Sequence, residues 1–513
     1  MGRDVFYLTS PIYYPNDVPH IGHAYNAVAC DFIARYHRLR GEEVFHLTGT
    51  DEHGLKLQRA AEQAGMHPQR WVDEMEPRWR EVWARLDIAN DDYIRTTEPR
   101  HEAAVTKLLL AVYENGNDDI YLGTYEGLYC VSCEAYYTED DLVNGLCPIH
   151  ERPVEHVTEE NYFFRLSAYA NKLLEHYERN PSAVEPASRR NEVLSTIRQG
   201  LRDFSISRTT FDWGFPLPWD PKHICYVWFD ALTNYITAAG YAEPGGRFDA
   251  VWPADIHVIG KDILRFHAIY WPAMLMAADV EPPTQVWAHG FLTVGGKKMS
   301  KTNATGIHPF ELIDQFGTDS YRWYFMREMR FGEDGSFSLE SMQERHNADL
   351  ANGLGNLASR VLAMLASNFG GDVPAPEVDG VEEDLPAVVE RAVAAYDEHM
   401  LAVNLQQALV SVWTIVDRLN GYLVEKEPWK LAKDETRRDA LGSILYAGAE
   451  ALRVLAILIQ PIMPSAAERL WEQLGMAEPL LHQRVPTSVR WGGLKPGTAT
   501  TKGGALFPRV ETD

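Results

Sequence analysis

Apolar residues in the first fifty positions follow the periods of a strand, a helix and a second strand. One extended apolar segment lies at 5–10, and another lies at 44–47, after Gly41. This order predicts a βαβ unit, and therefore a parallel sheet with a right-handed crossover. Between the two segments, apolar positions recur at helical spacing at Val28, Phe32, Ile33, Tyr36 and Leu39.

The alternation of strands and helices is interrupted and then resumes. Residues 115–205 are rich in tyrosine, cysteine and acidic side chains, and we interpret them as an insertion into the sheet domain. The α/β pattern resumes at Tyr226–Asp230, Ile256–Gly260 and Val286–Phe291. After about residue 340 the strand signals stop and long amphipathic helices follow, which predicts a helical bundle.

From these patterns we predict an α/β fold with several domains. A doubly wound parallel-sheet (Rossmann-like) domain carries the inserted connective domain, and an α-helical bundle follows it. The helix that contains Trp71, Trp79 and Trp83 is expected to use these rings for packing rather than for binding a cofactor. The predicted boundaries are 1–114 for the first half of the sheet domain, 115–205 for the insertion, 206–340 for the second half and its junction, and 341–513 for the helical domain and C-terminal tail.

Composition is typical of a globular protein of the cytoplasm. Of 513 residues, 45% are hydrophobic and 24% are charged, and no long apolar run follows Met1. The most apolar stretch, 451–463, is broken by Arg453, Gln460 and Pro461, so we expect no membrane span. The net charge of −25 argues against a general nucleic-acid coat, but it allows a nucleic-acid partner that binds to local basic patches.

Three of the five cysteines lie close together in the predicted insertion. Cys130 and Cys133, followed after thirteen residues by Cys147 and His150, form a Cys-x2-Cys and Cys-x2-His pattern. Three thiolates and one imidazole complete a tetrahedral zinc site, whereas a disulfide is the weaker explanation in a cytosolic chain. Because four protein ligands leave no open position on the metal, we expect one structural Zn²⁺ that supports folding rather than chemistry.

Two histidines lie where the first helix is predicted to begin, in the segment Pro19-His20-Ile21-Gly22-His23. Backbone N–H groups and the positive end of the helix dipole meet at such a position, so two imidazoles there can complete a cradle for a phosphate group. A lone His-x-x-His pair, however, is more often made of ordinary capping or core residues.

A second motif, Gly295–Thr302, changes that balance. Its lysines Lys298 and Lys301 lie on a glycine-hinged loop and can fold over a triphosphate, where they neutralise charge that builds up as pyrophosphate leaves. Taken alone, this segment would be interpreted as a solvated basic loop. Together with the histidine pair it resembles the HIGH and KMSKS signatures of class I aminoacyl-tRNA synthetases, in the same order, with Thr302 keeping the hydroxyl of the last serine.

Four further segments resemble the methionyl-tRNA synthetase family, and the resemblance extends from Val5 to about Met463. The segments are Tyr13–Asn16, Thr48–Gly54, Tyr226–Tyr235 and Ile259–His267. The family carries zinc knuckles in its insertion, and this chain has the pattern for one knuckle rather than two. The resemblance implies ATP-dependent activation of L-methionine, with Mg²⁺ accompanying ATP, and transfer of the methionyl group to tRNA(Met).

Site residues follow from the matched motifs. The resemblance implies that His20, Gly22 and His23 contact ATP, that Gly260 and Asp262 contact its ribose, and that Lys298 and Lys301 stabilise the pentacoordinate phosphate. Asp51 is expected to hold the methionine ammonium group. The walls of the methionine site are expected at Ile12, Tyr14, Trp228, Ala231, Tyr235, Ile263 and His267, a mainly apolar and aromatic set that suits a thioether.

Polar residues in the helical domain point to a nucleic-acid partner. Asn352, Asn356 and Arg360 are spaced by four residues and share one face of a helix, and Trp429 offers a ring on which a base can stack. A solvated polar face with a buried tryptophan is the plain alternative. Because these positions match the family's anticodon-binding residues, we expect them to contact the CAU anticodon loop.

Several alternatives are weaker. The isoleucyl, valyl and leucyl enzymes carry larger editing insertions, and the cysteinyl enzyme places zinc in its substrate site. A small-molecule nucleotidyltransferase would not need the polar set and Trp429 of the helical domain, and a non-catalytic tRNA-binding relative would have lost the histidines and lysines. The chain ends near Arg509 without the additional tRNA-binding OB domain of some family members, so we expect a monomer.

Overall fold

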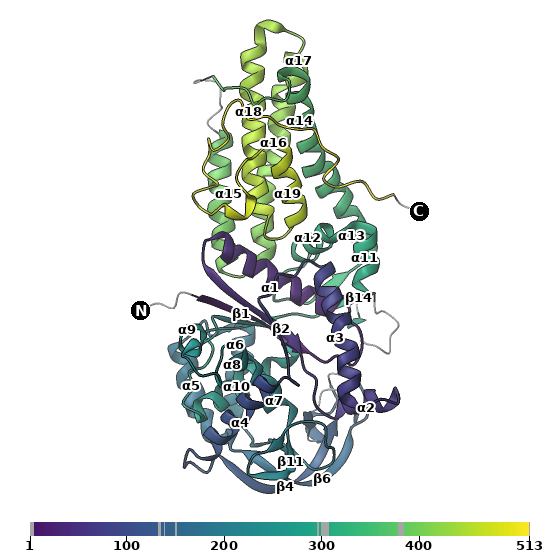
Figure 1. The fold of residues 1–513 in the computed structure, drawn as a ribbon, viewed down its shortest axis with the longest axis vertical. Coiled ribbons are helices and arrows are strands. Elements are labelled where there is room, and N and C mark those ends of the chain that lie inside the picture. Colours follow the sequence, from purple (N-terminus) through teal and green to yellow (C-terminus); the bar gives the residue numbers. More distant parts are fainter. Residues whose placement is uncertain are drawn as a thin grey trace.

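A parallel sheet separates the helical bundle from the rest of the molecule (Figure 1). In Figure 1 the bundle stands above this sheet, and an antiparallel sheet closes the opposite end of the molecule. The computed structural model describes residues 5–131, 135–137, 139–148, 151–294, 297–298, 307–377 and 384–511.

The parallel sheet confirms the predicted doubly wound architecture. Every strand pair in it is parallel, including the predicted βαβ pair β1 and β2. Strand order reverses between β1 and β12, which is where open α/β sheets bind their ligands. Across the sheet the strands are β3 (Asp92–Arg95), β2 (Glu43–Thr50), β1 (Val5–Tyr13), β12 (Ile256–Gly260), β13 (Val286–His289) and β7 (Val184–Glu185).

Alternate residues of the strands enter two different cores. In β1, Tyr7 belongs to the core on one face of the sheet and Leu8 belongs to the core on the other face. In β12, Val258 and Ile259 divide in the same way, as the period of two in a strand requires. Both faces are covered, which explains why these strands are continuous apolar runs in the sequence.

Helices cover both faces of the sheet. Helix α1 lies between the sheet and the bundle and is buried along most of its length (Figure 1). The apolar run 226–230, unlike Ile256–Gly260 and Val286–His289, does not form a strand: Tyr226 caps the buried helix α7, which contains the rest of the run. A short apolar run does not by itself distinguish a buried helix from a strand. The helices of this domain are α1 (Ile21–Leu39), α2 (Leu55–Gln63), α3 (Pro68–Arg85), α4 (Pro99–Tyr113), α5 (Ala170–Arg179), α6 (Ala187–Gln199), α7 (Val227–Leu232), α8 (Asn234–Ala238), α9 (Arg247–Val251), α10 (Trp271–Ala277), the 3₁₀ turn η3 (Lys261–Ile263) and the π-helical turn η4 (Phe266–Tyr270).

Two antiparallel sheets lie at the end of the molecule away from the bundle. The longer sheet is built on the pair β4 and β6, whose ladder runs from Ile120 opposite Phe164 to Tyr129 opposite Glu155. In Figure 1 both strands curve around the lower end of the molecule. The strands are β5 (Ala135–Tyr137), β4 (Ile120–Cys130), β6 (Glu155–Phe164) and β8 (Phe204–Ser205) in the first sheet, and β10 (Pro216–Leu217), β11 (Asp220–Cys225) and β9 (Ser207–Arg208) in the second.

A small three-stranded sheet joins the parallel sheet to the bundle. Its strand β14 follows β13 after a short connection and pairs antiparallel with β15 and parallel with β16. The elements of this junction are β14 (Leu292–Val294), β15 (Lys297–Lys298), α11 (Pro309–Phe316), α12 (Thr318–Glu328), β16 (Gly335–Phe337) and α13 (Leu339–Arg345).

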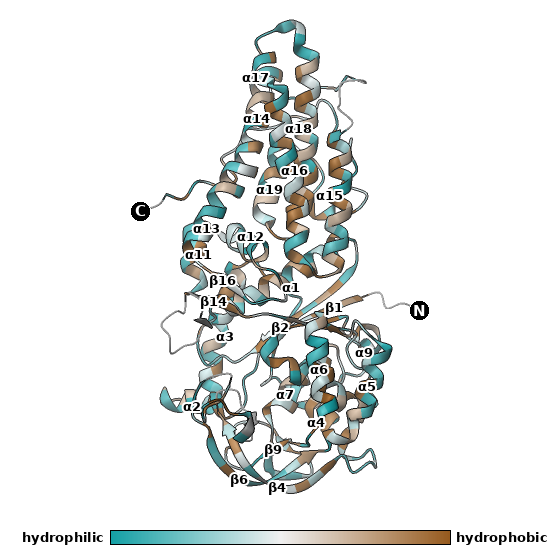
Figure 2. Ribbon diagram, turned by 180° about the vertical axis from the view of Figure 1, so that it is seen from behind, coloured by the Kyte–Doolittle hydropathy of each residue, from teal (hydrophilic) through white to brown (hydrophobic). Residues whose placement is uncertain are grey.

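The predicted helical bundle is confirmed in the C-terminal part of the chain. Apolar residues are frequent in α15 and α16, whereas α2 at the other end of the molecule is mostly hydrophilic (Figure 2). The bundle elements are the π-helical η5 (His346–Gly355), α14 (Asn356–Phe369), α15 (Asp384–Leu401), α16 (Leu405–Lys426), α17 (Pro428–Leu431), α18 (Arg438–Ile459) and α19 (Pro464–Gln473). Short 3₁₀ turns lie at η1 (Glu139–Asp141), η2 (Leu166–Tyr169), η6 (Glu435–Arg437) and η7 (Leu480–His482).

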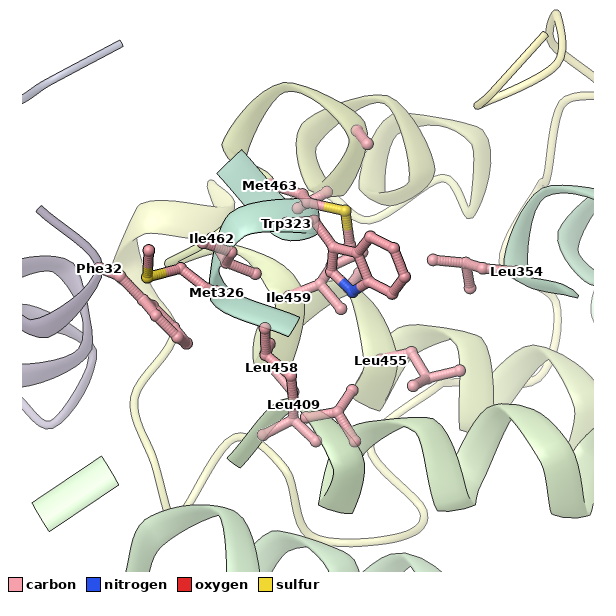
Figure 3. Close-up of a cluster of buried hydrophobic side chains, with 14 of the residues drawn as sticks. Phe32, Trp323, Met326, Leu354, Leu409, Leu455, Leu458, Ile459, Ile462 and Met463 are labelled. Atoms are coloured by element: carbon pink, nitrogen blue, oxygen red, sulfur yellow. The ribbon is translucent and has the colours of Figure 1, made fainter. Parts of the chain in front are cut away.

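The bundle and the sheet domain share one apolar core. Phe32 of α1 and Met326 of α12 pack with the corner that links α18 to α19, where Ile462 and Met463 are fully buried (Figure 3). Trp323 of α12 lies in the same cluster. The first helix of the sheet domain is therefore packed directly against the helical domain.

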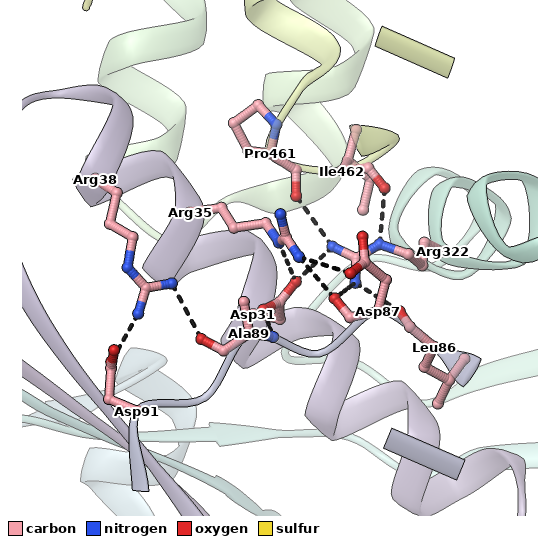
Figure 4. Close-up of polar contacts among 10 residues, drawn as sticks. All are labelled: Asp31, Arg35, Arg38, Leu86, Asp87, Ala89, Asp91, Arg322, Pro461 and Ile462. Carbon is pink, nitrogen blue, oxygen red and sulfur yellow. Dashed lines mark hydrogen bonds and ion pairs between the residues drawn. The ribbon is translucent and has the colours of Figure 1, made fainter. Parts of the chain in front are cut away.

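A buried ion pair lies at the same junction (Figure 4). The Arg322 guanidinium and the Asp31 carboxylate are both fully buried and lie 2.6 Å apart. Arg322 also donates to the carbonyls of Leu86, Pro461 and Ile462, which belong to two different connections. One side chain thus links α1, the end of α3, and the corner between α18 and α19.

One segment of the described chain is long and apolar enough to cross a membrane. This segment, Glu435–Ile459, is 100% buried within the bundle over its most apolar window. Its apolar character is that of a core helix packed on all sides.

Candidate active site

His20 and His23 cap the first helix reciprocally. The backbone N–H of Gly22 donates to Nδ1 of His20 at 3.1 Å, and the N–H of His20 donates to Nδ1 of His23 at 3.2 Å. The two rings stack with centroids 3.8 Å apart. In the neutral rings the proton is therefore on Nε2, so each ring has its N–H donor on that nitrogen. The pair therefore caps the helix and brings two imidazole side chains together at its first turn.

The loop before this helix is held by tryptophans of α3. Trp71 donates its indole N–H to the carbonyl of Pro15 at 3.1 Å, and Trp79 donates to the carbonyl of Asp17 at 3.0 Å. Trp79 also stacks on Tyr13, with ring centroids 5.3 Å apart. Trp79 and Trp83 pack in the apolar core as expected, and the sequence did not reveal that Trp71 and Trp79 also fix the loop that leads to His20.

Gly260 and Asp262 lie at the carboxyl end of β12, beside the start of α1. Strands β1 and β12 are neighbours, so this end faces the switch point of the sheet. A Cβ atom added to Gly260 would lie 2.6 Å from Oδ1 of Asp262. The turn therefore brings this carboxylate close to the backbone, and Asp262 is exposed at the edge of the site.

The residues predicted to bind methionine lie around the core that contains Tyr7, which we call the second core. This core contains Trp228 and Tyr235. The partly buried side chains of Ile12, Tyr14 and Ile263 pack against it. Trp228 stacks on Phe266 with ring centroids 3.7 Å apart. Phe266 belongs to the segment Ile259–His267 but is not among the residues predicted to bind a substrate. Only the structure shows that it stacks on Trp228. The remaining predicted wall residues, Ala231 and His267, are buried as well.

His267 is held as a neutral ring. Its Nδ1–H donates to the carbonyl of Ile263 at 3.0 Å, and its Nε2 accepts from the Tyr235 hydroxyl at 2.7 Å. Burial lowers the pKa of His267 to about 4. The wall of this site therefore carries no positive charge from His267 above about pH 5, which suits an uncharged side chain.

Asp51 is buried at the end of β2, next to β1. Its backbone N–H donates to the carbonyl of Tyr13 at 2.8 Å, and Asp51 as a whole is only 3% exposed. The next residue, Glu52, accepts from Arg95 at 2.8 Å and from Thr97 at 2.6 Å. Glu52 was not predicted as a functional residue, but its contacts tie the Asp51 loop to the end of β3.

The lysine motif follows the parallel sheet as predicted. Strand β15 pairs with β14, with Lys298 opposite Thr293 in the register, and the structure describes the backbone of Lys298. Lys301 and Thr302 lie outside the described residues. The base of the motif is fixed, because Asp334 accepts from the N–H of Phe291 at 2.7 Å just before β14.

The predicted zinc ligands are described only in part. Cys130 ends β4 and Cys147 follows it in the same insertion, and each is 1% exposed. Cys133 and His150 lie outside the described residues. Within the part of the chain that the structure describes, no group of three or more histidine, cysteine, aspartate or glutamate side chains is arranged so that it could hold a metal ion.

The polar set of the helical domain includes two exposed amides and one cation–π pair. Asn352 and Asn356 are exposed, and the Arg360 guanidinium carbon lies 5.5 Å from the centre of the Trp429 ring. Trp429 is 40% exposed, so the alternative of a buried tryptophan is wrong. The expected single α-helix is interrupted, since Asn352 lies in the π-helical η5 and α14 begins at Asn356.

Comparison with known proteins covers the whole chain. Residues 6–155 and 140–362 match the model of class I tRNA synthetases (M), and residues 373–513 match that of the anticodon binding domain of methionyl tRNA ligase. The chain is 51% identical to a methionine–tRNA ligase of Streptomyces coelicolor, covering 99% of this chain and 97% of that one. It is 45% identical to a methionine–tRNA ligase of Bacillus subtilis, covering 100% of this chain and 79% of that one.

A solved structure is also similar over the full length. Mycobacterium tuberculosis methionyl-tRNA synthetase in complex with methionyl-adenylate superposes with a TM-score of 0.93 at 43% identity, covering 99% of this chain and 100% of that one. The sheet order and the matched models define a class I aminoacyl-tRNA synthetase. Within this class, the chain belongs to the methionyl-tRNA synthetase family. Its reaction is the ATP-dependent attachment of methionine to tRNA.

Proposed function

We propose that Asp51 binds the methionine ammonium group and that the second core forms the wall around its side chain. The observation that carries this proposal is the burial of one carboxylate beside a mainly apolar and aromatic set, in which His267 is a neutral ring that accepts from the Tyr235 hydroxyl. Sulfur-to-ring contacts stabilise a thioether in such surroundings. The proposed wall residues are Ile12, Tyr14, Trp228, Ala231, Tyr235, Ile263 and His267.

ATP is proposed to bind across the start of α1 and the end of β12. The Nε2–H groups of His20 and His23 donate to phosphate oxygens, Gly22 lets the adenine approach, and Gly260 with Asp262 contacts the ribose. Mg²⁺ that accompanies ATP supplies charge neutralisation at the phosphates. Lys298 and Lys301 complete the proposed site from the hairpin loop.

The reaction then needs no covalent bond to the protein. The methionine carboxylate attacks the α-phosphorus of ATP, the bond to the β-phosphate breaks, and pyrophosphate leaves. The 2′-hydroxyl of the terminal adenosine of tRNA next attacks the methionyl carbonyl, and AMP leaves. The side chains act by placing the reactants and by stabilising the charge of the first transition state.

We propose one structural Zn²⁺ on Cys130, Cys133, Cys147 and His150. The donor chemistry fits, because thiolate and imidazole are the usual ligands of closed tetrahedral zinc sites. Cys130 and Cys147, the two described ligands, are buried thiols in the same insertion, and Sγ of Cys147 lies 3.6 Å from the Tyr137 hydroxyl. The metal would hold the end of β4 and the segment around Cys147 together and would take no part in the reaction.

Replacing Cys147 by serine is expected to abolish bound zinc, because the site loses one of its thiolates. Metal content per chain, measured by mass spectrometry after desalting, should fall from one zinc to none. Cys225→Ala is the matched control, since this thiol is also buried but lies at the end of β11, outside the proposed ligand set. Unchanged zinc in the Cys147 variant would reject the assignment.

The helical domain is proposed to bind the CAU anticodon loop. The exposed amides of Asn352 and Asn356 can hydrogen-bond to base edges, and the pair formed by Arg360 and Trp429 offers a charged and stacked surface.

Replacing Trp429 by alanine is expected to lower kcat/KM for tRNA(Met) by about 10- to 100-fold, because stacking of one base contributes roughly 1–3 kcal/mol. Trp429→Phe should keep most of the activity, since it keeps a ring. ATP–pyrophosphate exchange should be unchanged in both variants. An alanine variant that charges tRNA as well as the unmodified protein would show that this ring does not contact the anticodon.

Three further predictions remain proposals. We propose the domain boundaries at 114/115, 205/206 and 340/341, which limited proteolysis can test. We also propose that the protein is a monomer of the cytoplasm, which sedimentation and cell fractionation can test.

A further inference from the structure

Asp230 is fully buried between two histidine side chains. Nδ1–H of His53 donates to one carboxylate oxygen and Nε2–H of His101 donates to the other, each at 2.7 Å. Both rings are buried as well, with exposures of 4% and 0%. Burial by itself raises the pKa of Asp230, but the two imidazoles outweigh that effect and hold the pKa at about 2. At neutral pH Asp230 is therefore a carboxylate that accepts two hydrogen bonds.

These three side chains come from three separate segments. His53 lies in the loop after β2, His101 lies in α4, and Asp230 lies in α7. The second ring nitrogen of His101 lies 3.0 Å from Oγ1 of Thr237 in α8. The cluster thus connects the loop after β2 with α7 and α8 through α4.

The segments joined in this way carry opposite sides of the proposed methionine site. His53 lies two residues after Asp51, which is proposed to bind the ammonium group. Asp230 lies between Trp228 and Ala231, which are proposed to contact the side chain. The hydrogen bond from His53 to Asp230 is a short connection between the two sides. The contacts that the Glu52 side chain makes with Arg95 and Thr97 do not duplicate it, because they tie the loop to the end of β3.

We propose that Asp230 is a positioning residue that sets the distance between Asp51 and the wall formed by Trp228 and Ala231. This inference rests on the proposed role of Asp51. Binding sites need their groups to be held to within about 0.5 Å by surrounding contacts, and a buried, doubly bonded carboxylate supplies such a contact. Asp230 does not touch the substrate in this arrangement and acts through the residues on either side of it.

Asp230→Asn tests the proposal directly. Asparagine presents one acceptor and one donor in place of two acceptors, so it cannot satisfy both imidazole N–H groups. In ATP–pyrophosphate exchange, KM for methionine is expected to rise by about tenfold or more, while KM for ATP changes by less than about twofold. A tenfold change corresponds to about 1.4 kcal/mol. Asp319→Asn is the matched control, since Asp319 is also buried but accepts from Ala466 in the helical domain.

A pair of variants at His101 separates positioning from folding and stays informative if Asp230→Asn does not fold. The amide nitrogen of glutamine lies close to the position of a histidine Nε2, so His101→Gln keeps the donor to Asp230, whereas His101→Leu removes it. The glutamine variant should have nearly the KM for methionine of the unmodified protein, and the leucine variant should resemble Asp230→Asn. Equal KM values for methionine in the two His101 variants would overturn the proposal.

Asp51→Asn distinguishes this proposal from the proposed function. If Asp51→Asn raises KM for methionine and a folded Asp230→Asn does not, the positioning role of Asp230 is wrong and the role of Asp51 stands. If Asp51→Asn leaves KM for methionine unchanged, the assignment of Asp51 fails, and the inference about Asp230 fails with it. A rise in both variants, with the Asp319 control unchanged, supports both roles.

Discussion

Replacing His23 by asparagine is expected to lower the rate of methionyl-adenylate formation by about 10²-fold while methionine affinity stays nearly constant. Asparagine keeps an acceptor for the N–H of His20, so the helix cap survives. It loses the Nε2–H donor, which we expect to act mainly when charge builds up on the transferred phosphate. Single-turnover formation of the adenylate, with methionine binding followed by intrinsic fluorescence, measures both quantities.

The matched variant is His23→Gln, which keeps a donor near Nε2 and loses the capping acceptor. It should be less stable than the asparagine variant, by about 1 kcal/mol, and faster in adenylate formation. If the asparagine variant instead loses methionine affinity in proportion to its rate, His23 acts on amino-acid binding rather than on the transition state.

Replacing Arg322 by methionine is expected to destabilise the protein by about 3–5 kcal/mol. The change leaves the Asp31 carboxylate buried with one cation fewer and leaves several backbone carbonyls without their donor (Figure 4). The free energy of unfolding in urea measures the loss. Arg330→Met on the exposed pair with Glu333 is the control, and it should change stability by less than about 1 kcal/mol.

The loss of folding stability at low pH should depend on the same ion pair. Burial acts to raise the pKa of Asp31, but Arg322 and Arg35 outweigh it and lower this pKa from 3.8 to about 2. Because the folded-state pKa is lowered, the stabilisation is present above about pH 4 and is lost as the pH falls towards 2. The Arg322 variant should lose less stability over this interval.

If Arg322→Met lowers the free energy of unfolding at neutral pH by less than about 1 kcal/mol, this ion pair does not hold the two domains together.

The sequence predicted the parallel sheet, the βαβ unit and the bundle because short apolar runs alternate with segments of helical period and then give way to long amphipathic helices. Val258 and Ile259 enter opposite cores, and this alternation is hidden in a continuous apolar run, so the strand was recognisable but its two faces were not. The run 226–230 is apolar for a different reason, since it is a buried helix. Short apolar segments have no period that separates these two cases.

The chemistry of the site was predictable where residues close together in the sequence act together. His20 and His23 belong to one helix start, and their spacing together with the lysine motif predicted the cradle. The contact of His53 with Asp230 joins residues 177 positions apart, and the ion pair of Asp31 with Arg322 joins residues 291 positions apart. Neither partner could be found from spacing, because only the folded sheet brings these segments together.

ATP–pyrophosphate exchange with each of the twenty amino acids tests the central claim most directly. The buried carboxylate, the aromatic wall and the neutral His267 predict exchange with methionine at a kcat/KM well above that for every other amino acid. A hydrophobic site separates substrates that differ by one methylene by only ~1–3 kcal/mol, so weak exchange with similar apolar amino acids is compatible with the claim. Exchange with isoleucine or cysteine and none with methionine would contradict it.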